Sequence, residues 1–150
     1  MNTKTTIPAT ERVRHAVLGM PVAKALQLRF RSIEAGRVEL ELPIVEAFSF
    51  RPGQLQASAI FAAADFAAVS AAGTLLSEGW ANATIDGTIK FFAPACGSHL
   101  LARGRVINAG KLLSVCAADV YAVQDDGRET LCATWLGSAR NIQPATPPVQ

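Results

Sequence analysis

The order of apolar and polar positions divides the chain into one long apolar helix and two groups of strands. Residues 28–33 and 37–42 alternate with a period of two on either side of the Ala35-Gly36 pair, which predicts an antiparallel hairpin with one solvated face. The alanine-rich stretch 55–76 predicts a buried helix. Four further strands are expected after it, over residues 81–92, 98–108, 111–123 and 128–139.

A single apolar helix must bury its surface against another element. The simplest solution is one antiparallel sheet wrapped around the helix, which predicts an α+β domain. We expect this domain to span residues 21–142, with an N-terminal arm and helix over residues 1–20 and a tail over residues 143–150.

Composition narrows the class of protein. The hydrophobic fraction is 50%, at the high end for an isolated soluble domain, and it points to surface that is buried in an oligomer. The formal net charge is only +2 and the basic residues are scattered, so the sequence does not suggest nucleic-acid binding. The three cysteines are an odd number without C-x-x-C spacing, which disfavours disulfides and zinc sites and makes the cytoplasm the expected location.

Asp65 is the only charged residue in the apolar stretch 55–76. A carboxylate near the centre of a helix costs about 2.5–3.5 kcal/mol to insert into a membrane, so we expect a core helix and no membrane partner. On a buried helix, a carboxylate must be paired, hydrogen-bonded or shifted in pKa. Asp65 is therefore either a structural anchor or a catalytic group.

Several other catalytic patterns are missing from the sequence. His15 and His99 are isolated and belong to no acid–histidine motif, which argues against a dehydratase or hydratase. The sequence also has no G-x-S-x-G motif, no cluster of metal ligands and no phosphate-binding glycine loop. Among the charged groups, Asp65 is the best candidate for general acid–base chemistry.

Two short segments and the central helix resemble the hotdog-fold acyl-CoA thioesterases of the phenylacetate-degradation (PaaI-like) type. Residues 36–43 look like the second strand of that family, and Phe91-Phe92-Ala93-Pro94-Ala95 looks like its F-x-x-P-A segment. The resemblance covers about residues 21–142. It implies a hotdog fold and hydrolysis of an acyl-CoA thioester to a free acid and coenzyme A, with no cofactor beyond the coenzyme A of the substrate.

The family opens its central helix with H-G-G, nine residues before an acidic residue. Gln56 takes the place of the histidine here, since Asp65 follows it by nine positions (65 − 56 = 9), and Ala57 and Ser58 replace the two glycines. The resemblance implies that N–H groups at this helix start hold the thioester oxygen. Asp65 would then be the general base or the nucleophile.

The resemblance also implies roles for residues outside the helix start. Thr84 matches a strand Ser or Thr that helps to orient water in some relatives, although threonine is also common in strands for packing reasons. Substrate-binding roles are expected for Phe50, Gly53, Ser58, Phe61, Arg103 and Lys111. Phe50 falls where the family has a loop asparagine, and the two basic residues suit the phosphates of coenzyme A. Core packing and solvated strand charges are the alternative explanations.

The resemblance further implies a homodimer or a dimer of dimers. Two sheets would join edge to edge, and Asp65 of one protomer would face the helix start of the other. The expected partner is an acyl-CoA or a similar thioester. Because the histidine, the glycine pair and the asparagine of the family are replaced, a second hypothesis stands beside the first: a non-catalytic module that binds acyl-CoA or a related apolar acid.

Overall fold

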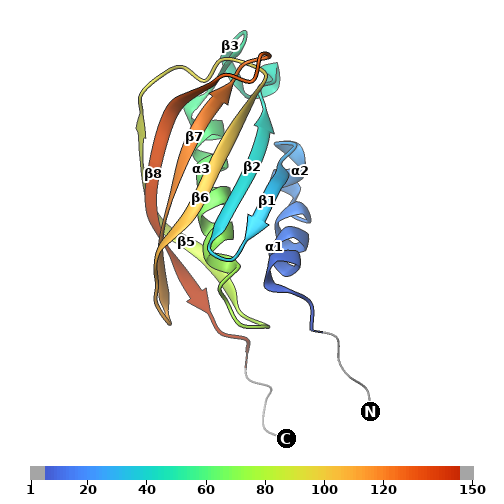
Figure 1. The fold of residues 1–150 in the computed structure, drawn as a ribbon, viewed down its shortest axis with the longest axis vertical. Helices are drawn as coiled ribbons and strands as arrows, with labels where there is room; N and C mark the ends of the chain where they lie inside the picture. The colour runs from blue at the N-terminus through green and yellow to red at the C-terminus, as the bar shows by residue number, and fades with distance from the viewer. Residues whose placement is uncertain (1–5, 146–150) are drawn as a thin grey trace, which may run out of the picture.

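The computed structural model describes residues 6–145 and contains a six-stranded antiparallel sheet that curves around one long helix (Figure 1). The helices are α1 (Ala9–Leu18), α2 (Pro21–Ala25) and α3 (Ala57–Gly73), with a 3-10 turn at Glu46–Phe48. The sheet has the order β1 (Arg29–Glu34), β2 (Arg37–Pro43), β6 (His99–Ala109), β7 (Leu113–Val123), β8 (Glu129–Ile142), β5 (Ala81–Phe91). This arrangement confirms the predicted α+β fold.

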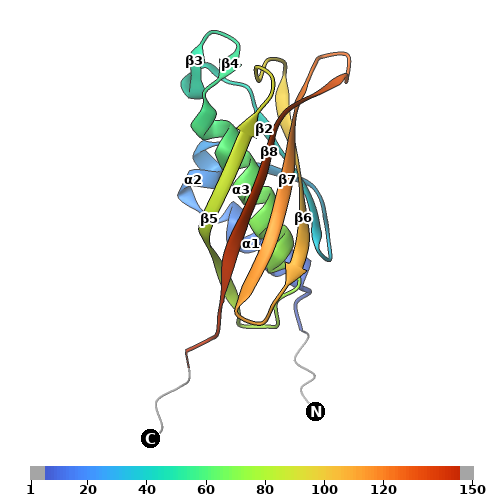
Figure 2. The same cartoon turned by 90° about the vertical axis from the view of Figure 1, so that its left-hand side faces the viewer.

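The helix α3 crosses the inner, concave face of the sheet (Figure 2). Most of its alanines are buried, and Ala63, Ala64 and Ala67 are completely so. On the facing strand β6, a Cβ atom at Gly104 would lie 2.1 Å from the carbonyl oxygen of Ala67, so only glycine allows this close approach. The small side chains therefore fix the height of α3 above the sheet, and with it the position of Asp65.

Among residues 6–145, no helix is long and apolar enough to cross a membrane. The 17 residues of α3 are apolar on nearly every side because the sheet covers most of the helix.

The predicted elements differ from the structure mainly at their ends. Strand β8 continues to Ile142, beyond the expected end at residue 139, because its last residues pair with the start of β5, where Ala81 lies opposite Ile142. The segment 47–54, expected as a loop, together with Leu55 forms the small hairpin of β3 (Ser49–Arg51) and β4 (Gln54–Leu55). Gly53 in its turn has φ +73°, a conformation that favours glycine.

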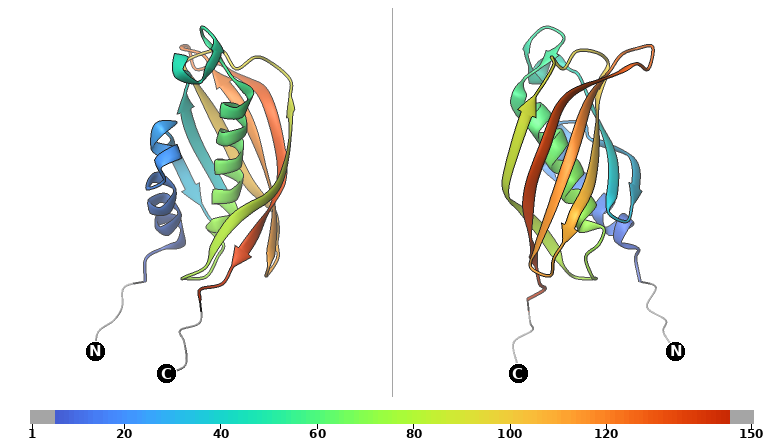
Figure 3. Two further views of the ribbon diagram at one scale, coloured as in Figure 1. Left: turned by 180° about the vertical axis from the view of Figure 1, so that it is seen from behind. Right: turned by 60° about the vertical axis from the view of Figure 1, so that its left-hand side comes forward.

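The N-terminal helix α1 packs beside the main body of the fold (Figure 3). Val17 is buried in the common core, and Arg12 donates a hydrogen bond of 2.9 Å to the carbonyl of Leu76, beyond the end of α3. The predicted arm and tail also include residues 1–5 and 146–150, which lie outside the described residues.

Candidate active site

Asp65 meets Thr84 between α3 and the edge strand β5. The Thr84 hydroxyl donates a hydrogen bond of 2.8 Å to Asp65 Oδ1. The pairing of β5 with β8 is interrupted between Thr84 and Asp86, which is a β-bulge. Because of this extra residue, Thr84 and Gly87 both face the helix, although an uninterrupted strand would put them on opposite faces. The bulge therefore aims Thr84 at the carboxylate.

Asp65 is only half-buried in the protomer, whereas the sequence predicted a buried carboxylate. The reason is its position beside β5, the last strand of the sheet. Burial still raises the pKa of the Asp65 carboxyl above its ordinary value, and the hydrogen bond from Thr84 lowers it in part. No basic side chain among residues 6–145 forms an ion pair with Asp65. A carboxylate in this environment suits proton transfer.

The neighbouring thiol is not a competing nucleophile. Burial raises the pKa of Cys116 to about 11, and the negative charges of Asp65 and Asp86 add to that rise. The thiol therefore stays protonated near neutral pH, and a protonated thiol is a poor nucleophile.

Gln56 caps the first turn of α3. Its side-chain Oε1 accepts hydrogen bonds from the backbone N–H and the hydroxyl of Ser58. Its main-chain carbonyl accepts from the N–H of Ala59 at 3.0 Å. Within residues 6–145, the N–H of Ala57 has no acceptor, as is usual for the first residue of a helix. Two N–H groups were expected to hold the thioester oxygen. The N–H of Ala57 is free to do so, whereas the N–H of Ser58 donates to Gln56.

Two mainly apolar hollows flank this helix start. One, of about 430 Å³, is lined by Phe50, Arg51, Gln54, Leu55, Gln56, Ala57, Ile60, Ala93, Pro94 and Ala95. The other, of about 440 Å³, lies towards α2 and is lined by Val22, Leu26, Ala47, Phe48, Ser49, Gln56, Ser58, Ala59 and Ala62. Phe50 stands at the first hollow with 61% of its surface exposed. Apolar walls beside one polar donor are typical of a site for an acyl group.

The free N–H of Ala57 and the carboxylate of Asp65 are far apart within one protomer. The two residues are eight positions apart on the same helix (65 − 57 = 8), which corresponds to about 12 Å along its axis. A single thioester carbonyl held at Ala57 is therefore out of reach of the Asp65 of the same chain.

Phe61 lies inside the fold rather than in either hollow. Its ring meets Trp135 edge-on, with 6.2 Å between the ring centroids and 83° between the planes. Phe61 is one helical turn before Asp65, so the two side chains lie on the same side of α3.

Sequence analysis did not single out Trp135. Its indole lies against Gly87 and Gly137, which pair with each other across β5 and β8. A Cβ atom on either glycine would come within 2.6 Å of the ring, so both positions need glycine. The signal available in the sequence was this recurrence of glycine within two predicted strands, which often marks a close approach.

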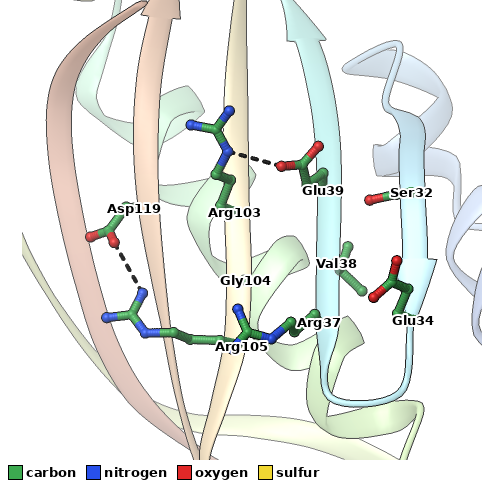
Figure 4. Close-up of a pocket in the computed structure, with 9 residues that line it drawn as sticks. All are labelled: Ser32, Glu34, Arg37, Val38, Glu39, Arg103, Gly104, Arg105 and Asp119. Atoms are coloured by element: carbon green, nitrogen blue, oxygen red, sulfur yellow. Dashed lines mark hydrogen bonds and ion pairs between the residues drawn. The ribbon is translucent and has the colours of Figure 1, made fainter.

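Arg103 and Lys111 lie away from Asp65. Figure 4 shows Arg103 on the outer face of the sheet, where its Nε is 2.9 Å from Glu39. Glu129 forms a second ion pair with Arg103 at 2.7 Å, and the ring of Tyr121 lies 4.7 Å from its guanidinium carbon. The outer hollow beside these residues, about 450 Å³, has charged walls. Lys111 lies in the turn between β6 and β7, at the opposite end of the molecule from the start of α3 (Figure 2).

Comparisons with known proteins agree with this architecture. Residues 57–128 match the family model of the thioesterase superfamily. A thioesterase family protein from Silicibacter pomeroyi is 30% identical, with a TM-score of 0.86 over 90% of this chain and 98% of that chain. No curated protein matches the sequence.

More distant structures share the fold. The PaaI protein from the phenylacetic acid degradation operon of E. coli is 21% identical, with a TM-score of 0.77 over 91% of this chain and 96% of that chain. A thioesterase from Haemophilus influenzae is 18% identical, with a TM-score of 0.79 over 97% of both chains. These likenesses confirm the predicted hotdog fold. With 30% identity over nearly the whole length of the Silicibacter protein, the chain belongs to the thioesterase superfamily.

Proposed function

We propose that the protein is an acyl-CoA thioesterase that releases a free acid and coenzyme A. The observation that carries this proposal is the Asp65 carboxylate, which has a hydroxyl for a partner and no ion-pair partner among residues 6–145. The free N–H of Ala57 and the apolar hollows beside it supply the second requirement, a place for the thioester carbonyl and its acyl chain.

The chemistry follows from these two groups. Asp65 takes a proton from water, and the water oxygen forms a bond to the thioester carbon. The carbonyl oxygen becomes an oxyanion, which the Ala57 N–H and the positive end of α3 stabilise. When the oxyanion collapses, the carbon–sulfur bond breaks, and the coenzyme A thiolate leaves and takes up a proton. Thr84 holds the Asp65 carboxylate in position throughout.

The two groups act together across a homodimer. The outer side of β5 has no strand partner among residues 6–145, and Ile85 on its bulge has 58% of its surface exposed. A long edge strand with exposed apolar residues favours pairing with a second copy. In such a dimer, or in a dimer of dimers, Asp65 of one protomer faces the Ala57 N–H of the other. This pairing removes the separation of about 12 Å within one protomer.

One observation favours the alternative function, a module that binds an acyl-CoA without cleaving it. Gln56 occupies the N–H of Ser58, so the helix start offers a thioester oxygen fewer free donors than an uncapped turn would. Binding needs only the hollows and one donor, whereas hydrolysis also needs Asp65.

Hydrolysis of a panel of short, long and aromatic acyl-CoA esters, followed by thiol release, tests the proposal. Asp65→Asn is expected to lower kcat by about 10²–10⁴-fold, because the amide cannot accept the proton from water. Glu129→Gln is the matched control, since it makes the same change in a carboxylate on the outer face, and it is expected to keep kcat within twofold.

Equal activity of wild type and Asp65→Asn would refute the role of Asp65. Tight binding of coenzyme A esters by a wild-type protein that cleaves none of them would support the binding module instead.

A further inference from the structure

Among residues 6–145, Arg51 is the one charged residue in the walls of the two hollows at the start of α3. It lines the hollow that also contains the free N–H of Ala57. The basic residues that the sequence suggested for the phosphates of coenzyme A, Arg103 and Lys111, lie on the outer face and at the opposite end of the molecule. Arg51 is therefore the cation that lies beside the proposed thioester site.

The position of Arg51 is set by the small hairpin of β3 and β4. Figure 2 shows this hairpin projecting beyond the start of α3. Arg51 pairs with Gln54 across the turn. The turn itself consists of Pro52 followed by Gly53, which has φ +73°, and this is the residue pattern of a type II turn. Proline and glycine at these positions favour one turn geometry, so the backbone that carries Arg51 is held in place.

Two contacts fix the direction of the Arg51 side chain. Its guanidinium carbon lies 5.2 Å from the centre of the Phe50 ring, and its Nε donates a hydrogen bond of 2.7 Å to Oε1 of Gln54. Both contacts leave the terminal nitrogens Nη1 and Nη2 without a hydrogen-bond partner among residues 6–145. These two nitrogens carry four of the five N–H donors of a guanidinium, so Arg51 keeps most of its donors free.

An exposed arginine without a carboxylate partner is suited to bind an anion. No acidic side chain among residues 6–145 forms an ion pair with Arg51, whereas Glu39 and Glu129 both pair with Arg103. The free edge of a guanidinium matches two oxygens of a phosphate, and such a charge-assisted pair is roughly twice as strong as a neutral hydrogen bond. Because Arg51 is already held by its two contacts, it loses less rotamer freedom when the anion binds.

The distance from Arg51 to the helix start suits the phosphates of coenzyme A rather than the thioester. Gln54, its partner across the hairpin, precedes Ala57 by three residues of extended chain (57 − 54 = 3), which corresponds to about 10 Å. In coenzyme A, the flexible pantetheine arm separates the thioester sulfur from the diphosphate, and the 3′-phosphate on the ribose lies farther away. With the thioester carbonyl at the Ala57 N–H, the diphosphate is the nearer anionic group to Arg51.

We propose that Arg51 binds the diphosphate of coenzyme A, so that it selects coenzyme A thioesters over thioesters that lack this group. This inference rests on the proposed function, because it takes the thioester carbonyl to be held by the N–H of Ala57. The pantetheine arm then lies along the apolar hollow between Ala57 and Phe50, and the phosphates lie at its charged rim. Arg51 thus determines the carrier of the acyl group and takes no part in breaking the carbon–sulfur bond.

Arg51→Gln tests the inference, because it removes the charge from an exposed side chain, where substitutions change stability little. With the same acyl group on each carrier, KM of the coenzyme A thioester should rise about tenfold, with kcat within twofold. KM of the pantetheine thioester, which has no phosphate, should stay within twofold. The dephospho-coenzyme A thioester keeps the diphosphate and lacks only the 3′-phosphate, so its KM should also rise about tenfold.

Arg37→Gln is the matched control. Arg37 is also exposed and has no ion-pair partner among residues 6–145, but it lies on the outer face of the sheet (Figure 4). Its replacement should leave KM within twofold for all three thioesters.

Calorimetric binding of coenzyme A itself gives a readout that does not depend on hydrolysis. Its dissociation constant should rise about tenfold in Arg51→Gln, and this rise would support the phosphate site even if Asp65→Asn kept full activity. An unchanged KM and dissociation constant would overturn the inference even if hydrolysis by Asp65 is confirmed. An equal rise of KM for the coenzyme A and pantetheine thioesters would also overturn it, because Arg51 would then shape the hollow without contacting a phosphate.

Discussion

On the outer face of the sheet, Glu129 meets the guanidinium of Arg103 at 2.7 Å, whereas on the inner face Asp65 accepts a hydrogen bond from the hydroxyl of Thr84. The pKa of Glu129 is lowered, because the hydrogen bond and charge of Arg103 favour its ionised form. The pKa of Asp65 is raised, because burial disfavours its ionised form more than Thr84 favours it.

The difference lies in what surrounds each carboxylate rather than in its chemistry. Arg103, Glu39 and Glu129 neutralise one another in a half-exposed network, and such surface pairs contribute little to stability. Asp65 has lost part of its water, and no cationic side chain within residues 6–145 pairs with it, so it remains able to take a proton. In the proposed function, this incompletely compensated carboxylate on the inner face is the group that takes the proton from water.

The largest expected effect comes from removing the Ala57 N–H in one protomer and the Asp65 carboxylate in the other. Ala57→Pro removes the N–H alone, because proline is favoured at the first helical position and Gln56 already has φ −76° and ψ 148°. Alone, it should lower kcat by about 10²–10³-fold. A heterodimer of Ala57→Pro with Asp65→Asn, purified through two different tags, should recover about half of wild-type activity, because one of its two sites is intact.

The two variant homodimers, measured at the same concentration, are the controls for this recovery. A heterodimer no more active than the homodimers would mean that both groups act within one protomer. That result would refute an active site shared between two protomers.

An intermediate effect is expected from Thr84→Val, which removes the hydrogen bond to Asp65 and keeps the shape of the side chain. Thr84 lowers the pKa of Asp65, so its loss raises that pKa further. Hydrolysis needs the carboxylate, so kcat/KM of the variant should fall at a higher pH than in wild type as the solution is acidified. We expect a loss of several-fold at pH 5 and less than about threefold at pH 8. Coinciding pH profiles would show that Thr84 only packs.

On the inner face, the contribution of Asp65 to stability should fall as the pH rises. Burial raises the pKa of Asp65 in the folded protein, so its carboxyl favours folding most when protonated, and this contribution is lost as the pH rises through the folded pKa. Asp65→Asn should therefore gain stability relative to wild type at pH 7 and lose this advantage below pH 3.8, the ordinary value for the group. Denaturant unfolding at the two pH values measures the difference.

The smallest effect is expected on the outer face. Arg103→Gln removes the ion pairs to Glu39 and Glu129 and should cost at most about 1 kcal/mol of unfolding free energy at neutral pH, less at high salt. The pKa of Glu129 is lowered by Arg103, so the stabilisation is present above its ordinary value of 4.5 and disappears as the pH falls through the lowered one.

The same variant tests the role in coenzyme A binding that the sequence suggested for Arg103. KM for acyl-CoA should be unchanged, because Arg103 lies on the face opposite Asp65 and is occupied by two carboxylates. A rise in KM of tenfold or more would instead place the substrate phosphates on the outer face.

The sequence predicted the helix and strands because their signals are local. Alternation over residues 28–42, the alanines of α3 and the turn residues between strands each reflect the burial of one face. Asp65 was also visible, because a charge in an apolar helix is rare. The small hairpin of β3 and β4 was missed, since its strands are too short for a periodic pattern.

What the sequence alone determined was the class of fold and the family resemblance, and it singled out Asp65 as the candidate catalytic group. The tertiary structure decided what each candidate touches: Thr84 reaches Asp65 through a bulge, Gln56 uses up the N–H of Ser58, and Arg103 is neutralised on the outer face. It also brought out Trp135, whose buried indole leaves room only for glycine at positions 87 and 137. Periodicity reports which residues are buried, but hydrogen bonds and ion pairs depend on distances between segments far apart in the chain, which only packing fixes.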